Sequence, residues 1–273
     1  MDQYLVFGNP IAQSKSPLIH SMFAQQTGQE LQYGRMLAVK EDFIEHLERF
    51  FSDPQAQGCN VTAPFKEMAA QWVNELSPSA KLAGAINTIK RQRDGRFFGD
   101  TTDGPGLVQD LLRLGVTLTN KRILLLGAGG AARGVLSPLL LQQPTLLMVA
   151  NRSVAKAQLL ASLVDSDALQ SCEFEALTKI SQPFDLIINS TSASLSGELP
   201  NIANSVIARA GCIYDMSYAD KPTVFMSHAS QLGVVNVYDG LGMLVGQAAE
   251  SFYLWRGLKP KVEPVIQALR SQL

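Results

Sequence analysis

Short apolar runs alternate along the chain with stretches that repeat apolar residues at helical spacing. In the first hundred residues this pattern predicts strands at 4–7, 36–39 and 58–61, and helices over 17–28, over 41–52, and from Pro64 and Pro78 onward. Prolines that open a helix and glycines that close one mark these boundaries. Asp94 and Gly95 separate two further apolar runs and predict a two-residue hairpin. Because strands alternate with helices, a mainly parallel sheet is favoured.

The alternation becomes more regular after Asp103. A helix over about 107–114 follows Asp103-Gly104-Pro105-Gly106. Apolar strands are then expected at 122–126, 145–150, 184–189, 211–215 and 234–237, with helices at about 130–142, 153–164 and 222–232 between them. Two final helices, over 241–256 and 262–272, are too little for a third domain, so we expect them to return to the first. The fold class is therefore α/β and two-lobed. Residues 1–103 and 240–273 form one domain, and residues 104–239 form a second domain inserted within it.

Composition agrees with two folded domains, because 273 residues are about twice the ~150 typical of one. A hydrophobic content of 46% with 17% charged residues is enough to build cores. Lys and Arg number 23 against 24 Asp and Glu, and no long run of one sign occurs. A basic face for nucleic acid or an anionic membrane is therefore not expected.

Cysteine and histidine spacing argues against a metal site. Cys59, Cys172 and Cys212 are far apart and fit neither a disulfide framework nor a zinc motif, which is typical of a reducing cytoplasm. His20, His46 and His228 also lack ligand spacing. Residues 1–10 do not resemble an export signal. The uncharged stretch 134–151 is interrupted by two prolines and predicts a helix and a strand rather than a membrane span.

A glycine-rich turn follows the strand predicted at 122–126. It reads Gly127-Ala128-Gly129-Gly130-Ala131-Ala132 and enters an apolar helix. Strand, G-x-G-x-x-A and helix form the dinucleotide-binding fingerprint in its required context, with backbone N–H groups at the helix start facing the pyrophosphate. The inserted domain is thus predicted to be of Rossmann type.

The segment after the next strand favours NADP over NAD. An NAD enzyme usually places a carboxylate here for the ribose hydroxyl, but the chain reads Asn151-Arg152-Ser153, with Lys156 one turn later. Two cations and a hydroxyl suit the 2′-phosphate of NADP. Ordinary surface charges and a helix-capping Ser153 are the alternative interpretation.

Polar clusters mark the predicted ends of strands in the first domain, where open α/β sheets bind ligands. With the glycine turn they form an ordered series of motifs over nearly the whole chain. The motifs are Gly8-Asn9-Pro10 with Ser14-Lys15-Ser16-Pro17, Asn60-Val61-Thr62-x-Pro64-Phe65-Lys66, Gly84-Ala85-x-Asn87-Thr88, Thr102-Asp103-Gly104, Gly127–Ala131, Asn151-Arg152 and Asp239-Gly240-Leu241-Gly242-Met243-Leu244. In this order they resemble the shikimate dehydrogenase family.

The resemblance implies NADP-dependent, reversible reduction of 3-dehydroshikimate to shikimate, a step of aromatic amino-acid biosynthesis. Lys66 and Asp103 match the family's catalytic pair. An ammonium can protonate the alkoxide that hydride addition leaves, and a carboxylate can orient it. Matching substrate contacts are Ser14, Ser16, Thr62, Asn87, Tyr218 and Gln247. In addition to the glycine turn and residues 151–156, the matching cofactor contacts are Met216, Gly240 and Met243.

Two departures from the family pattern occur. Thr101 stands where an asparagine is usual, and Ser153 and Lys156 stand where threonine and arginine are common. Lysine offers a point charge in place of a bidentate fork, which could soften the choice of NADP. A quinate/shikimate dehydrogenase and a non-catalytic ligand-binding regulator stay open as alternatives, although a regulator needs no proton donor. Monomer and homodimer also both stay open.

Overall fold

A computed structural model describes residues 1–272, apart from the side chain of Leu195. Contacts divide the chain into two compact units. The first unit comprises Met1–Gly106 and Val245–Leu269, and the second comprises Leu107–Leu244 with the residues from Arg270 onward. The boundaries at either end of Leu107–Leu244 fall inside helices, one in α5 (Asp103–Arg113) and one in α10 (Leu241–Arg256). The chain therefore enters and leaves the second unit along helices.

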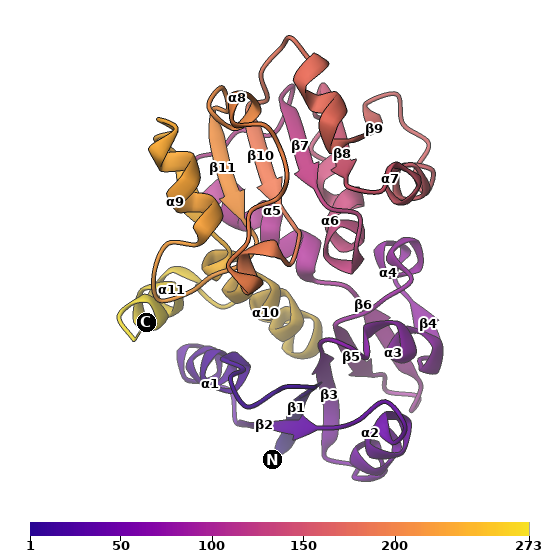
Figure 1. Cartoon of the computed structure of the whole chain (residues 1–273). Helices are drawn as coiled ribbons and strands as arrows, with labels where there is room; N and C mark the ends of the chain where they lie inside the picture. The colour runs from indigo at the N-terminus through magenta and orange to yellow at the C-terminus, as the bar shows by residue number, and fades with distance from the viewer. Residues whose placement is uncertain (273) are drawn as a thin grey trace. The chain divides into compact units, whose positions relative to one another are not determined.

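The first unit is built on a mixed six-stranded sheet in the order β2-β1-β3-β5-β6-β4. Its strands are β1 (Asp2–Gly8), β2 (Leu31–Leu37), β3 (Ala56–Val61), β4 (Glu75–Leu76), β5 (Thr88–Arg91) and β6 (Phe97–Asp100). The first turn of α5 and most of α10 belong to this unit. Its other helices are α1 (Ser16–Thr27), α2 (Phe43–Ser52), α3 (Lys66–Trp72), α4 (Pro78–Ala83) and α11 (Glu263–Arg270). Parallel pairing joins β1 to β2 and β3, and β4 to β6, while β5 runs antiparallel to both of its neighbours (Figure 1).

Period-two alternation decides which face of this sheet each side chain covers. Phe7 and Val61 point to the face covered by α2 and α3, where Phe43 stacks on Phe65 with ring centroids 4.5 Å apart. Tyr4 packs instead on Trp255 of α10, at 4.6 Å. Burying each of these side chains stabilises the fold by about 1.5–3 kcal/mol.

Gly58 lets α10 approach the sheet. A Cβ atom at this position would lie 2.4 Å from the indole nitrogen of Trp255, and that nitrogen donates to the carbonyl of Ile89 at 2.9 Å. Gly106 and Gly246 allow a similarly close approach of α5 and α10 within the first unit, because a Cβ on Gly246 would lie 3.0 Å from the Gly106 carbonyl. These contacts place Gln247 and Ser251 beside the sheet.

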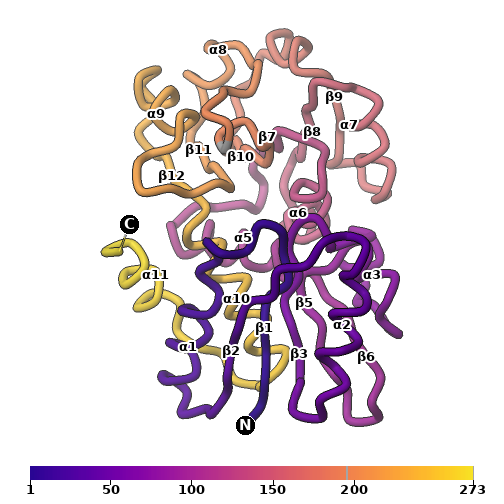
Figure 2. Tube along the Cα trace, turned by 60° about the horizontal axis from the view of Figure 1, so that its bottom comes forward, coloured from indigo at the N-terminus to yellow at the C-terminus, as the bar shows by residue number. Residues whose placement is uncertain are grey.

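The second unit has a six-stranded, parallel sheet in the order β12-β11-β10-β7-β8-β9. Its strands are β7 (Arg122–Leu126), β8 (Leu146–Asn151), β9 (Leu169–Glu173), β10 (Leu186–Asn189), β11 (Cys212–Asp215) and β12 (Val237–Asp239). Its further helices are α6 (Gly130–Leu140), α7 (Val154–Ala161), α8 (Asn204–Ile207) and α9 (Val224–Gln231), with 3₁₀ helices η1 (Phe174–Lys179) and η2 (Ala193–Ser196). Figure 2 shows the same elements along the Cα trace.

Helices cover both faces of this sheet. Ile123 and Leu125 pack with α5, α6 and α7 on one face, while Leu124 and Leu126 pack with α8 and α9 on the other. Strand β7 is apolar from Ile123 to Leu126 because both of its faces are buried there. The uncharged stretch 134–151 becomes the end of α6 and the strand β8, and no helix among residues 1–272 has the length and apolarity to cross a membrane.

Several local predictions were wrong. The strand expected at 234–237 is β12 at Val237–Asp239, because its bounds are set by pairing with β11. The strand expected at 36–39 is β2, which pairs residue for residue with β1 from Leu31 to Leu37. The polar residues of this segment give no clear strand pattern in the sequence, and the bounds of β2 are set by its pairing with β1. Pro64 does not open α3. It follows a cis peptide bond inside a turn in which Phe65 donates to the Thr62 carbonyl, and the helix begins at Lys66.

The hairpin loop and strand β9 also differ from expectation. Gln92 donates to the Arg96 carbonyl at 2.8 Å, so three residues form the loop, with Gly95 at φ 86°. A three-residue loop that ends in a left-handed glycine is the next common hairpin type. Strand β9 was not predicted because it is a half-exposed edge strand whose composition is largely polar.

Candidate active site

Polar residues gather at one edge of the first unit's sheet. Strands β1, β3 and β6 end at this edge, and the antiparallel β5 begins there, since Thr88 pairs with both Asn60 and Asp100. Ligands bind at the carboxyl ends of strands in open α/β sheets. Lys66, Asn87 and Asp103 all lie just beyond these strand ends.

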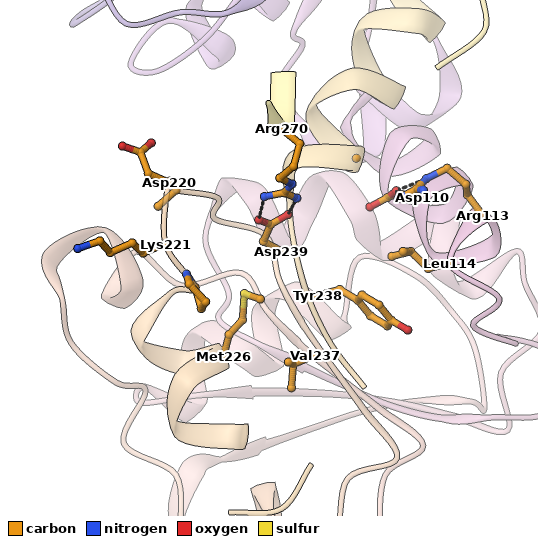
Figure 3. Close-up of a pocket in the computed structure, with 13 residues that line it drawn as sticks. Asp110, Arg113, Leu114, Asp220, Lys221, Met226, Val237, Tyr238, Asp239 and Arg270 are labelled. Atoms are coloured by element: carbon orange, nitrogen blue, oxygen red, sulfur yellow. Dashed lines mark hydrogen bonds and ion pairs between the residues drawn. The ribbon is translucent and has the colours of Figure 1, made fainter. Parts of the chain in front are cut away.

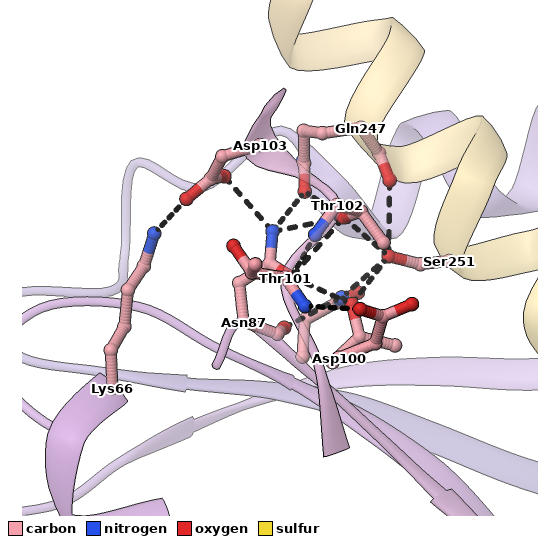
Figure 4. A network of polar contacts seen from close by, with 10 residues as sticks. Lys66, Asn87, Asp100, Thr101, Thr102, Asp103, Gln247 and Ser251 are labelled. Atoms are coloured by element: carbon pink, nitrogen blue, oxygen red, sulfur yellow. Dashed lines mark hydrogen bonds and ion pairs between the residues drawn. The ribbon is translucent and has the colours of Figure 1, made fainter. Parts of the chain in front are cut away.

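Lys66 and Asp103 form an ion pair (Figure 4). The Lys66 Nζ atom lies 2.6 Å from Asp103 Oδ2, and the side chains are 33% and 17% exposed. Each residue is the first of its helix, α3 and α5. The lysine is therefore held in place by a neighbouring carboxylate while part of it still reaches solvent.

Asn87 connects this pair to the rest of the site. Its side-chain oxygen Oδ1 accepts hydrogen bonds from the Thr102 backbone N–H and from the Thr88 hydroxyl, both at 2.9 Å, which fixes the orientation of the side-chain amide. Its Nδ2 group then faces Asp103 Oδ1 at 2.9 Å and Gln247 Oε1 at 3.0 Å. Asn87 is only 3% exposed, so the structure makes it a link between Asp103 and Gln247.

Ser251 lies at the centre of the network beneath these groups. Its fully buried hydroxyl accepts from Asn60 Nδ2 at 3.0 Å and also contacts the hydroxyls of Thr88 at 2.7 Å and Thr102 at 3.2 Å. It donates to the Gln247 carbonyl, one turn earlier on α10, at 3.0 Å. Sequence motifs do not mark Ser251. The available signal is a polar residue on the buried face of an otherwise apolar helix.

Tyr33 is hydrogen-bonded to the same network, and His20 packs on Tyr33. The Tyr33 hydroxyl donates to Asn60 Oδ1 at 2.6 Å, and burial holds the pKa of Tyr33 well above its usual value, so the donor proton is kept. The His20 ring stacks on Tyr33 at 4.3 Å and is fully buried. Burial lowers the pKa of His20 to about 3, which keeps the imidazole neutral near pH 7.

The predicted contacts Ser14 and Thr62 lie on the loops after β1 and β3, and Ser16 is the first residue of α1. Ser14 Oγ accepts from the Ser16 N–H at 3.3 Å, and the Ser14 carbonyl accepts from Arg35 at 2.7 Å. The Thr62 methyl group occupies the space beside Gly8, where a Cβ would lie 2.5 Å away. The three residues therefore lie in the segments that follow two adjacent strands.

The glycine turn of the second unit fits a phosphate. Gly127 has φ 107°, and a Cβ there would lie 2.8 Å from Ser190 Oγ, so only glycine suits the position. Gly129 and Gly130 are exposed and have open space around them at the start of the eleven-residue helix α6. Ala128 is half-buried and Ala131 exposed. Nothing within 4 Å would obstruct a Cβ at Gly129 or Gly130, which leaves room for a phosphate to approach their N–H groups.

Residues 151–156 follow the adjacent strand β8. Asn151 Nδ2 donates to the Ser153 carbonyl at 3.0 Å and shapes the turn. Ser153 occupies the N-cap position of α7, yet its hydroxyl makes no capping hydrogen bond. Arg152 and Lys156 are exposed and form no ion pair within residues 1–272. This donor set fits a phosphate monoester.

Met216, Gly240, Met243 and Tyr218 all belong to the second unit. A Cβ on Gly240 would lie 2.1 Å from the Met216 carbonyl, so glycine is required where these two segments meet. Met243 is 8% exposed and belongs to the core. Tyr218 is half-buried, and burial raises its pKa. Unlike the other predicted substrate contacts, it does not lie in the first unit.

Asp215 holds the loop that carries Met216 and Tyr218. This fully buried carboxylate accepts from Ser194 at 2.6 Å, from Thr223 at 2.7 Å and from the Ser217 N–H at 3.1 Å. The sequence shows Asp215 only as a residue at a strand end. Its role becomes visible because donors from two separate segments, η2 and the loop between β11 and α9, meet on it.

A pocket of about 220 Å³ lies beside Asp239 in the second unit (Figure 3). Arg270 binds both carboxylate oxygens of Asp239, at 2.6 and 2.7 Å, and Arg113 pairs with Asp110 at 2.8 Å. Lys221 and Asp220 also line the pocket, so its cations and carboxylates are equal in number. It contains none of the predicted site residues.

A Rossmann-type unit with an open phosphate turn and Arg152, together with a lysine–carboxylate pair at a sheet edge, defines a dinucleotide-dependent dehydrogenase. Family models match residues 6–89 (shikimate dehydrogenase substrate binding domain), 108–207 (shikimate/quinate 5-dehydrogenase) and 240–270 (shikimate 5′-dehydrogenase C-terminal domain). The chain belongs to the shikimate dehydrogenase family.

Similar proteins cover the whole chain. The shikimate dehydrogenase (NADP(+)) of Photobacterium profundum is 55% identical over 99% of this chain and 98% of its own length. That of Vibrio atlanticus is 52% identical over 100% and 98%. A solved Ael1 enzyme from Pseudomonas putida has a TM-score of 0.94 at 42% identity, with 98% of each chain covered. Shikimate 5-dehydrogenase from Thermus thermophilus, solved with NADP(H) and shikimate, has a TM-score of 0.88 at 31% identity, with both chains fully covered.

Proposed function

We propose that this chain catalyses the NADP-dependent, reversible reduction of 3-dehydroshikimate to shikimate, with Lys66 and Asp103 as its acid–base pair. The observation that carries this assignment is the 2.6 Å contact between Lys66 Nζ and Asp103 Oδ2 at the ligand-binding edge of the sheet, in a chain of this family. The reaction is a step of aromatic amino-acid biosynthesis, and we place it in the cytoplasm.

The bound cofactor supplies or accepts the hydride. Lys66 Nζ donates a proton to the oxygen of the reacting carbon during reduction and receives it back during oxidation. Asp103 Oδ2 orients Nζ and accepts a hydrogen bond from the reacting hydroxyl, while Asn87 holds the other carboxylate oxygen at 2.9 Å. The pair is therefore prearranged for the charge that develops on the substrate oxygen.

We assign the remaining predicted residues to binding. Residues 1–103 and 240–273 hold the substrate, with Ser14 and Ser16 toward its carboxylate and Thr62, Asn87 and Gln247 toward its ring hydroxyls or carboxylate. Tyr218, which belongs to the other domain, is assigned as a further contact to the carboxylate. Residues 104–239 hold NADP. The amides of the 127–131 turn face its pyrophosphate, Arg152 with Ser153 and Lys156 binds its 2′-phosphate, and Met216, Gly240 and Met243 lie toward the nicotinamide.

Turnover with four pairings, NADP or NAD with shikimate or quinate, tests the function. We expect NADP with shikimate to give the highest kcat/KM, measured as the rise in absorbance of the reduced nicotinamide. Faster turnover with quinate would replace the substrate assignment. Absence of turnover in all four pairings, with binding of NADP intact, would leave a regulator as the function.

Ser251→Ala tests the buried network. Removing the hydroxyl leaves Asn60 Nδ2 and the Thr88 hydroxyl short of a partner and loosens Asn87. We expect kcat to fall about tenfold with a smaller change in KM, and the free energy of unfolding to fall by about 1–3 kcal/mol. Steady-state kinetics and urea unfolding measure the two effects. The exposed Ser227→Ala is the matched control, and an unchanged kcat in a less stable Ser251→Ala protein would reduce the hydroxyl to a purely structural role.

A further inference from the structure

The first unit has a second cavity, at the end of its sheet opposite the candidate active site. Asp2, Tyr4 and Gln57 line it from the starts of β1 and β3, and Trp255 and Arg256 line it from the end of α10. The last residues of β5 and the loop after it complete the lining, because β5 runs antiparallel to β3. Its volume is about 620 Å³, within the range of about 300–1,000 Å³ found for small-molecule sites.

Cations dominate this cavity. The cationic side chains are those of Lys90, Arg91, Arg93, Arg96 and Arg256, and the carboxylates are those of Asp2 and Asp94. Arg96 pairs with Asp94 at 2.7 Å, and Arg256 pairs with Asp2. Three positive charges are therefore left without a carboxylate, in a chain whose net charge is −1. The pocket beside Asp239, by contrast, has equal numbers of both signs.

Neutral groups hold two of these three cations. Lys90 Nζ donates to the Leu254 carbonyl at 2.7 Å, and Arg91 donates to the Asp53 carbonyl at 3.1 Å. Carbonyl groups orient the side chains but do not cancel their charge. Arg93 is exposed and has no hydrogen bond or ion pair within the described part of the chain. Lys90 points to the α10 side of the sheet, whereas Arg91 points to the other side, where its guanidinium lies over the rings of Phe51 and Phe97. Lys90 and Arg93 repel one another, and an anion between them would remove that repulsion.

Unpartnered polar atoms occur among the same residues. Arg91 Nε and Gln92 Oε1 are buried, and neither has a hydrogen-bond partner among residues 1–272. Buried polar groups without partners are uncommon in folded proteins and need an explanation, such as a missing water or ligand. Gln92 belongs to the loop that lines the cavity, whereas the Arg91 guanidinium lies over Phe51 on the other side of the sheet.

The apolar wall of the cavity is fixed. Trp255 donates to the Ile89 carbonyl at 2.9 Å, packs against Gly58 and contacts the buried Tyr4 ring at 4.6 Å. Rigid walls keep the cations apart, so a ligand does not have to order the site when it binds.

We propose that this cavity binds a small anion with two or more negative charges, carried by phosphate or carboxylate groups. Guanidinium and ammonium groups bind both kinds through short, charge-assisted hydrogen bonds. The site suits a ligand with two or more charges because Lys90 and Arg93 both lack a carboxylate partner. The proposal is independent of the reaction, since none of the proposed catalytic or binding residues lines the cavity.

Calorimetric titration with inorganic phosphate and with citrate, at constant ionic strength, tests the proposal. We expect the wild-type protein to bind at least one probe, and the better probe identifies the ligand as a phosphate or a polycarboxylate. Arg93 is exposed, so Arg93→Gln and Arg93→Glu leave the fold intact. Arg93→Gln is expected to weaken binding about tenfold, and Arg93→Glu to weaken it further.

Two controls separate this cavity from other causes. Lys179→Glu changes the net charge equally at an exposed position of the second unit and should leave the dissociation constant unchanged. Arg152→Gln weakens the proposed cofactor phosphate site and should also leave it unchanged. The proposal is overturned if neither probe binds the wild-type protein, if Arg93→Glu and Lys179→Glu behave alike, or if Arg152→Gln abolishes binding.

Discussion

Lys66→Ala is expected to lower kcat for shikimate oxidation by about 10²–10⁴-fold, because it removes the group that exchanges a proton with the reacting oxygen. Asp103 would lose its 2.6 Å partner but keep its hydrogen bond from Asn87, so the binding residues stay in place. We therefore expect the dissociation constants of shikimate and NADP to change little. Steady-state kinetics and ligand titration measure the two quantities separately.

The matched control is Lys81→Ala, which removes an exposed lysine from α4 in the same unit. Its kcat should equal that of the wild-type protein. Near-normal kcat in Lys66→Ala would refute the acid–base assignment. Loss of shikimate binding together with kcat would instead make Lys66 a binding residue.

Arg152→Gln is expected to raise KM for NADP by about 10²-fold and to leave KM for NAD nearly unchanged. The exposed guanidinium has no carboxylate partner within the described residues, so its charge is available to a phosphate. A charge-assisted hydrogen bond contributes about 1.5–3 kcal/mol, and a bidentate pair contributes toward the upper end of this range. The ratio of kcat/KM for the two cofactors is the measurement.

Lys156→Gln provides the comparison within the same site. A point charge one turn along α7 should contribute less than the fork of Arg152, so we expect a smaller rise in KM for NADP. Equal losses with NADP and NAD in Arg152→Gln would show that the residue supports the fold of the turn and does not select the 2′-phosphate.

Features that depend on residues close together in the sequence could be predicted from it. Strand β7 was predicted with its observed bounds because its two buried faces give an unbroken apolar run, and the glycine turn follows it directly. The first and last residues of α10 were also predicted correctly. Strand β2 was misplaced because its bounds depend on pairing with β1, which is not written in its own composition.

Groups assembled from distant segments could not be predicted in this way. Ser251 bonds to Asn60 across 191 positions of the chain and to Thr88 across 163. The basic cavity was missed for the same reason. The balanced composition argued against concentrated positive charge, but Lys90, Arg93 and Arg96, from β5 and the loop after it, line one cavity with Arg256 of α10. Only the folded chain shows that their carboxylate partners are too few.

The division of the chain into units has a consequence for synthesis on the ribosome. Nearly all of the second unit is one continuous segment, Leu107–Leu244, so it can fold as soon as that segment has emerged. The first unit must wait, because Gln247, Ser251 and Trp255 are made after almost everything they contact. A nascent chain would therefore acquire its phosphate turn before its catalytic network is complete, and the proposed proton donor Lys66, although made early, would be among the last groups to reach its working surroundings.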